Sequence, residues 1–231
     1  MTQDEAKLAV AKRATEFVQD GMVVGLGTGS TATMFIRELA ARKRKIRCVA
    51  SSDASHELGR SLGMDVQTLA ELPELDLYVD GADEVCRRVD AMDPREIDLI
   101  KGGGGALLRE KIVASAARQF IVVVDSTKVV ETLGRFPLPV EVIKMALPLV
   151  EPRLRELGLN PKLRQKKDGS GVFLTDEGNY ILDCAAGRIE EPESLAAELK
   201  SIVGVVEHGL FLGMATLALV AGEDGVAEYR A

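Results

Sequence analysis

The chain has 231 residues, of which 46% are hydrophobic and 28% charged, as is typical of a folded globular protein. Its formal net charge of −7 argues against nucleic-acid binding, because a phosphate backbone is bound through a basic surface. The sequence shows neither a signal peptide nor an apolar run long enough to cross a bilayer. We therefore expect a cytoplasmic protein with no membrane partner.

The cysteines and histidines predict neither a disulfide framework nor a metal site. Cys48, Cys86 and Cys184 are far apart and lack CxxC spacing, which favours reduced thiols. His56 and His208 lack metal-ligand spacing with each other or with a cysteine, so a structural role explains each of them better. We expect no metal and no cofactor.

Helices and buried strands alternate through the first half of the chain. This alternation predicts a parallel, doubly wound α/β sheet. Apolar residues at helical spacing predict a first helix from Ala6 to Phe17. The strand, helix, strand, helix and strand that follow are expected at 22–26, 32–39, 47–52, 54–62 and 65–68.

The turn Gly27–Thr31, between the first strand and its helix, has the composition of an anion-binding loop. A glycine turn that opens a helix exposes backbone N–H groups and the positive end of the helix dipole. Thr28, Ser30 and Thr31 add hydroxyl donors. Ser30 stands where a dinucleotide fingerprint has its third glycine, and the Walker lysine is missing, so the turn favours a single phosphate group. The same pattern also fits a simple helix N-cap.

Charged residues gather around a second glycine turn. Asp80 and Asp83 follow an apolar strand expected at 75–79, and the carboxyl ends of such strands carry the ligand sites of open α/β sheets. Lys101 precedes the turn Gly102–Gly105, which opens a helix expected over 106–118 with Glu110 in its second turn. Charge near a core is retained when it is paired or used chemically. The alternatives are solvated acids beside a flexible loop and an ordinary helix salt bridge of Glu110.

Two lysines are candidates for binding the phosphate. The apolar run 120–124 predicts a central parallel strand, and Lys128 follows it at the same edge as Asp80. Lys7 could reach the phosphate from the first helix. The alternative for each lysine is an ordinary solvent-exposed side chain that binds nothing.

The pattern changes after Pro137 and Pro139. A helix at 145–157, a β-hairpin at 172–182 turning at Glu177-Gly178, a helix at 193–202 and a strand at 205–211 predict a smaller α+β lobe. The apolar tail 215–221 is expected to return to the main sheet. We predict one domain over 1–130 plus 207–231 and an inserted small domain over 131–206.

Seven segments occur in a recognisable order: 24–31, 78–84, 100–104, 109–111, 136–142, 175–179 and 204–211. In content and order they closely resemble the ribose-5-phosphate isomerase A family over nearly the whole chain. One departure is the span from Glu84 to Lys101, which is longer than is usual in the bacterial family. The charged run Arg87–Glu96 fills it, next to the predicted site.

The resemblance implies a Rossmann-like domain with a smaller antiparallel lobe, and an aldose–ketose isomerase. Such an enzyme interconverts D-ribose 5-phosphate and D-ribulose 5-phosphate through an enediol(ate), in the non-oxidative branch of the pentose phosphate pathway and without a cofactor. It implies Glu110 as the general base and a homodimer, with a tetramer still open. The catalytic groups it implies are Glu110, Asp80, Asp83 and Lys101. The substrate contacts it implies are Thr28, Gly29, Ser30, Thr31, Asp80, Gly81, Ala82, Asp83, Lys101, Gly102, Gly103, Gly104 and Lys128.

Other function classes remain open from the residues alone. An amino-sugar-phosphate deaminase or a coenzyme A transferase could use a related fold, and the transferase would employ a glutamate as nucleophile. A sugar-phosphate sensor would need an attached DNA-binding helix-turn-helix, and only one helix precedes the first expected strand.

Overall fold

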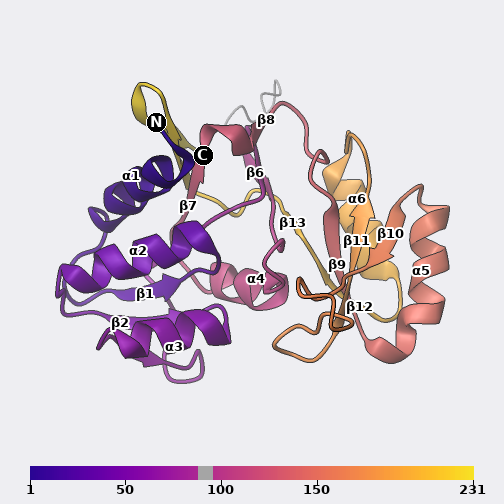
Figure 1. Cartoon of the computed structure of the whole chain (residues 1–231), viewed down its shortest axis with the longest axis horizontal. Coiled ribbons are helices and arrows are strands. Elements are labelled where there is room, and N and C mark those ends of the chain that lie inside the picture. The colour runs from indigo at the N-terminus through magenta and orange to yellow at the C-terminus, as the bar shows by residue number, and fades with distance from the viewer. Residues whose placement is uncertain (88–95) are drawn as a thin grey trace.

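The computed structural model describes residues 1–87 and 96–231 and has a large and a small lobe (Figure 1). The large lobe is built on a sheet of order β15-β14-β7-β4-β1-β2-β3. Its strands are parallel except β15, which pairs antiparallel with β14. Their bounds are β1 (Val23–Leu26), β2 (Arg47–Ala50), β3 (Asp65–Gln67), β4 (Leu77–Asp80), β7 (Phe120–Asp125), β14 (Leu217–Gly222) and β15 (Gly225–Arg230).

Both faces of this sheet are covered, as a doubly wound fold requires. Alternate residues of β7 show it: Ile121 and Val123 pack in the core beneath α1 and α2, while Val122 and Val124 pack in the core that contains α4. The helices of this lobe are α1 (Gln3–Thr15), α2 (Ser30–Ala41), α3 (Asp53–Ser61) and α4 (Leu107–Ser115). The predicted α/β class and the return of the tail as β14 are confirmed.

A small sheet bridges the large lobe and the small one, and the sequence did not predict it. Its order is β13-β6-β5-β8. The strands are β5 (Glu84–Arg87), β6 (Ile97–Ile100), β8 (Val129–Val130), which follows the 3₁₀ turn η1 (Ser126–Lys128), and β13 (Leu210–Phe211). Val85, Leu99 and Phe211 pack from it into the α4 core.

The two described ends of the span from Glu84 to Lys101 contribute strands β5 and β6 to this small sheet. β5 and β6 pair antiparallel, with Glu84 opposite Ile100 and Arg87 opposite Ile97. Of the charged run Arg87–Glu96, residues 88–95 lie outside the described residues. The pairing places Arg87 and Ile97 roughly 10 Å along the strands from the end that carries Asp83 and Lys101.

The small lobe is an antiparallel sheet of order β10-β11-β9-β12. Helices α5 and α6 pack on it at the far end of the molecule from α1 (Figure 1). The bounds are β9 (Leu138–Val142), the 3₁₀ turn η2 (Lys144–Ala146), α5 (Leu147–Glu156), β10 (Asn160–Leu163), β11 (Tyr180–Ala185), α6 (Pro192–Ser201) and β12 (Val205–His208). The predicted small α+β lobe is present, and its boundaries as a domain stay a prediction.

Two predicted elements of this half are only partly right. The predicted turn at Glu177-Gly178 is present, closed by the bond from Gly178 N to Thr175 O, but of the hairpin expected at 172–182 only the second arm is a strand, β11. The Thr175 hydroxyl donates to Glu141 of β9, which holds this segment as a turn. The strand expected at 205–211 is divided between two sheets at Gly209, where a Cβ would lie 2.3 Å from Lys101 O.

Within the described ranges, no helix is long and apolar enough to cross a bilayer.

Candidate active site

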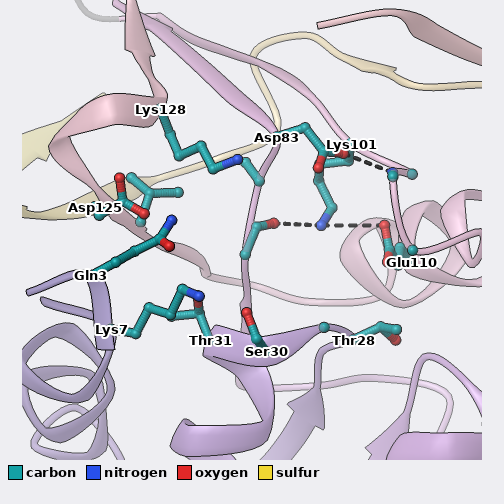
Figure 2. A pocket seen from close by; sticks show the side chains of 17 residues that line it. Gln3, Lys7, Thr28, Ser30, Thr31, Asp83, Lys101, Glu110, Asp125 and Lys128 are labelled. Atoms are coloured by element: carbon teal, nitrogen blue, oxygen red, sulfur yellow. Dashed lines mark hydrogen bonds and ion pairs between the residues drawn. The ribbon is translucent and has the colours of Figure 1, made fainter. Parts of the chain in front are cut away.

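A cavity of about 160 Å³ lies at the carboxyl ends of the neighbouring strands β1, β4 and β7, where the sequence predicted a site (Figure 2). Every predicted substrate contact except Asp80 lines it. The lining residues are Gln3, Lys7, Thr28, Gly29, Ser30, Thr31, Gly81, Ala82, Asp83, Lys101, Gly102, Gly103, Gly104, Glu110, Val124, Asp125 and Lys128.

The first glycine turn presents the N-terminus of α2 to this cavity. Gly29 is the N-cap residue of α2 and has no side chain, so no Ser or Thr hydroxyl caps this helix. Its φ of 103° lies in the left-handed region that favours glycine. Ser30 and Thr31 begin the helix and line the cavity. The turn therefore offers N–H groups and hydroxyls to an anion.

The Thr28 hydroxyl is held by serines that the sequence reasoning missed. Its Oγ1 lies 3.0 Å from Ser51 Oγ and donates to Ser52 Oγ at 2.9 Å. Ser55 joins this group by donating to Gly27 O at 2.5 Å. These residues lie at the end of β2 and the start of α3, so the next strand of the sheet fixes the turn.

Asp80 lies behind the cavity wall. Its carboxylate has a relative exposure of 0% and accepts bonds from Thr28 N at 2.8 Å and Gly81 N at 2.7 Å. It also accepts from the Tyr78 hydroxyl and from Lys101 Nζ, the latter at 2.8 Å. Burial, and next the charge of Asp80, hold the pKa of Tyr78 well above its usual range. Asp80 thus ties both glycine turns to the end of β4.

Lys101 and Glu110 form a buried pair at one end of the cavity (Figure 2). Lys101 Nζ lies 3.2 Å from Glu110 Oε2 and donates to Gly81 O at 2.6 Å. The Lys101–Glu110 contact is an ion pair without hydrogen-bond geometry, so Glu110 Oε2 has no hydrogen-bond donor among the described residues. Glu110 lies in the first turn of α4, which begins at Leu107, and not in the second turn as predicted.

The charges of this pair shift both pKa values. Burial raises the pKa of Glu110 to about 8, against the attraction of Lys101, and the nearby charge of Asp80 adds to the rise. Burial alone would lower the pKa of Lys101, but the attraction of Asp80 and Glu110 outweighs it and raises that pKa. Lys101 therefore stays a cation, and Glu110 is the group that gains proton affinity.

The second glycine turn holds Asp83 against the cavity. Gly103 N donates to Asp83 Oδ2 at 2.7 Å, and Asp83 N donates to Ile100 O at 2.8 Å. Gly102 and Gly105 have φ values of 104° and 91°, which require glycine at both ends of the turn. Asp83, unlike Asp80, lines the cavity.

Two lysines occupy the opposite end of the cavity from Glu110 (Figure 2). Lys7 comes from α1 and Lys128 from η1, and both line the cavity. The Lys7 side chain is only 15% exposed, and its nitrogen lies 3.9 Å from Asp4, so it is neither freely solvated nor tightly paired. The cavity thus has a cationic end next to the N-terminus of α2 and a buried carboxylate, Glu110, at the opposite end.

Two polar lining residues, Asp125 and Gln3, and the apolar Val124 were not predicted. Asp125 ends β7 and caps η1, the turn that ends at Lys128, by accepting from Thr127 N at 3.0 Å. Gln3 is the first residue of α1, where a polar side chain is common, so nothing in the sequence indicated that it would line the cavity.

Sequence comparison connects this geometry to known enzymes. The model of the family described as ribose 5-phosphate isomerase A (phosphoriboisomerase A) matches residues 47–225. Ribose-5-phosphate isomerase A of Roseiflexus sp. (strain RS-1) is 50% identical over 96% of this chain and 94% of its own. That of Agrobacterium fabrum (strain C58) is 46% identical over 100% of both chains.

Solved structures agree over the full length. Ribose 5-phosphate isomerase A from Methanocaldococcus jannaschii has a TM-score of 0.92, 39% identity and coverage of 100% of both chains. A D-ribose-5-phosphate isomerase in complex with phospho-erythronic acid has a TM-score of 0.94, 35% identity and the same coverage. The chain belongs to the ribose 5-phosphate isomerase A family.

Proposed function

We propose that the chain interconverts D-ribose 5-phosphate and D-ribulose 5-phosphate, a step of the non-oxidative branch of the pentose phosphate pathway. The observation that carries the proposal is Glu110: a buried carboxylate beside Lys101, in the same cavity as the N-terminus of α2 and the cations Lys7 and Lys128. The names of relatives that match end to end support this substrate.

Glu110 acts as the base in this proposal. In the open-chain aldose, its carboxylate takes the proton from C2, the C2–H electron pair forms the C1–C2 double bond, and the carbonyl electrons move onto O1. The proton of the O2 hydroxyl is then transferred to O1, the O2–H electron pair forms the carbonyl at C2, and the electrons of the C1–C2 double bond take the proton back from Glu110 at C1, which gives the ketose. Its raised pKa suits a base that must take a weakly acidic carbon proton.

Lys101 and the N–H groups of the second glycine turn stabilise the charge that develops on the enediolate oxygens. Of the two predicted aspartates, Asp83 lines the cavity, and we assign to it the hydroxyl protons and the opening of the furanose ring. Asp80 is buried and holds Lys101 and Thr28 in place, so its proposed role is positioning.

The phosphate binds at the other end of the cavity. The first turn of α2, the hydroxyls of Ser30 and Thr31, and the cations Lys7 and Lys128 converge there. This local cluster is needed because the chain as a whole carries a net charge of −7 and repels an anion at long range. Phospho-erythronic acid, the ligand of the related D-ribose-5-phosphate isomerase structure, carries a phosphate and a carboxylate, and we expect one of these groups to bind at each end of this cavity.

The test is a coupled assay of ribose 5-phosphate conversion to ribulose 5-phosphate. We expect saturable turnover that phospho-erythronic acid inhibits competitively. Absence of turnover would refute the proposal, and turnover of an acyl-coenzyme A with covalent labelling of Glu110 would favour the transferase alternative instead. From the family resemblance we also propose a homodimer, which light scattering tests by a mass twice that of the chain, with four times that mass indicating a tetramer.

A further inference from the structure

Arg164 of the small lobe touches the glycine turn of the active site from the side away from the cavity. It follows β10, and its side chain is only 12% exposed. Its Nη1 donates to Gly102 O at 2.8 Å and lies 3.4 Å from Gly103 O. Asp183 of β11 holds the same guanidinium, accepting from Nε at 2.9 Å and from Nη2.

A second side chain of the small lobe packs on the same turn. At Gly105, an added Cβ would lie 2.3 Å from Phe173 Cζ, so the ring rests directly on the glycine. The Arg164 guanidinium lies 5.8 Å from the centre of that ring. Arg164 and Phe173 therefore pack together against the turn Gly102–Gly105 and support it.

The carbonyl that Arg164 contacts is connected to Asp83 through a single peptide unit. The carbonyl of Gly102 and the N–H of Gly103 belong to the same amide, and that N–H donates to Asp83 Oδ2 at 2.7 Å. A cation at the carbonyl end polarises the amide and strengthens its N–H as a donor. The Gly103 carbonyl likewise shares an amide with the N–H of Gly104, which lines the cavity.

We propose that Arg164, held by Asp183, is a positioning residue for the isomerisation: it orients and polarises the amides of the second glycine turn that face Asp83 and the enediolate. This inference rests on the proposed function. It gives the small lobe a part in the chemistry, although neither Arg164 nor Asp183 lines the cavity in the described structure.

The test compares Arg164→Met, Arg164→Lys and Asp183→Asn with the wild type. We expect Arg164→Met to lower kcat about 10- to 100-fold, as a small misplacement of reacting groups does, while KM changes little because the phosphate site is at the other end. Lys keeps the charge but has no planar fork, so Arg164→Lys should recover only part of the rate. The kcat of Asp183→Asn should lie between that of Arg164→Met and that of the wild type.

Two inhibitors separate a positioning role from a purely structural one. The carboxylate of phospho-erythronic acid carries at the reacting end a negative charge that the enediolate has and the ground-state sugar lacks, so the inhibition constant of this compound should rise in Arg164→Met even though KM does not. The inhibition constant of inorganic phosphate should not change. Arg153→Met is the matched control: it removes an exposed ion pair with Glu156 in the same lobe and should leave all these constants as in the wild type.

The outcomes distinguish the inference from the function on which it rests. If the wild type does not convert ribose 5-phosphate, the proposed function fails. If the wild type is active and Arg164→Met has a normal kcat, the inference fails. A rise in KM and in both inhibition constants, with kcat intact, also overturns it. If Arg164→Met does not fold, the inference is tested with Arg164→Lys and Asp183→Asn, by measuring the same kcat, KM and inhibition constants.

Discussion

Among the charged residues of the site, Glu110 differs from Asp80 in how its charge is satisfied. Asp80 and Glu110 flank Lys101, so a buried trio of charged side chains has one cation for two carboxylates. Asp80 accepts from Thr28, Gly81 and Tyr78 besides Lys101, whereas Glu110 Oε2 has only the ion pair within the described structure. An unsatisfied buried charge is costly, so the proton affinity rises on Glu110.

This asymmetry predicts the pH dependence of the rate. Glu110 is a base only when ionised, and its pKa is raised from 4.5 to about 8. The ionised form is therefore present above the raised pKa and is lost as the pH falls through it. We expect the acid limb of kcat/KM to have its midpoint well above 4.5 and up to about 8.

The substrate phosphate titrates at about pH 6 and needs a control. Inhibition by phospho-erythronic acid, measured over the same pH range, reports the titration of a phosphate group without proton transfer. If the acid limb appears also in the pH profile of kcat, the group that titrates belongs to the enzyme–substrate complex. An acid limb at or below pH 4.5 would show that Glu110 has an ordinary proton affinity.

Thr31→Ala should mainly raise KM. The phosphate lies away from the reacting carbons, so its contacts act as uniform binding in ground and transition states. Loss of one hydroxyl bond to a charged group costs about 1.5–3 kcal/mol, which is a rise in KM of about 10- to 150-fold. Steady-state kinetics tests this. A lower kcat with an unchanged KM would mean that the turn positions the reacting end instead.

The active site consists of two glycine turns held by the strand ends between them, and close approach explains some of their glycines. An added Cβ at Gly103 would lie 2.5 Å from Asp83 Oδ1, whereas one at Gly104 would be in ordinary contact, 3.8 Å from Thr28 Cγ2. The two positions have no positive φ, so they differ in space and not in backbone strain.

Gly103→Ala should therefore destabilise the fold and Gly104→Ala should not. Forcing an extra methyl into filled space costs about 1–3 kcal/mol, while a Gly→Ala change in open space is neutral or stabilising. Chemical denaturation of both variants measures the difference. Equal free energies of unfolding would show that Asp83 yields easily and is not held by the turn.

Elements with strong local patterns were predicted from the sequence, and elements defined by partners were not. β1, β7 and α2 follow from apolar runs and helical spacing. β9 and β10 contain Pro139 and Pro161, and proline argues against a strand when the sequence is considered alone. The residues that line the cavity could be named from their type and order, but the burial of Asp80 and the contacts of Arg164 depend on tertiary packing.

At the scale of the whole molecule, the sheet brings residues from α1 to η1 into one cavity. Sequence order alone could not place Lys7 and Lys128 in the same cavity. That placement depends on α1 packing against β7, which the structure shows and no local pattern encodes. The order of the motifs still predicted that the two glycine turns would lie at the same edge of the sheet, because the carboxyl ends of parallel strands meet there.

Metal removal should leave the activity unchanged. Across residues 1–87 and 96–231, no group of three or more His, Cys, Asp or Glu side chains could hold a metal ion, and the proposed reaction uses protein donors. The assay is repeated after dialysis against EDTA. A loss of activity that returns with an added divalent cation would contradict this prediction.

The most direct test of the account is Glu110→Gln. Glutamine keeps the shape of the side chain but cannot accept the C2 proton, so kcat should fall by at least the roughly 10²–10⁴-fold typical of a positioned base. Glu141→Gln is the matched control: Glu141 is also buried with an oxygen that lacks a donor in the described structure, but it lies outside the cavity, so its replacement should leave kcat intact.

The decisive measurement is exchange of the substrate's C2 deuteron with solvent. We predict that Glu110→Gln loses this exchange together with isomerisation, while folding and inhibition by inorganic phosphate stay as in the wild type. Near-normal isomerisation and exchange in Glu110→Gln would contradict the account and move the base to another residue.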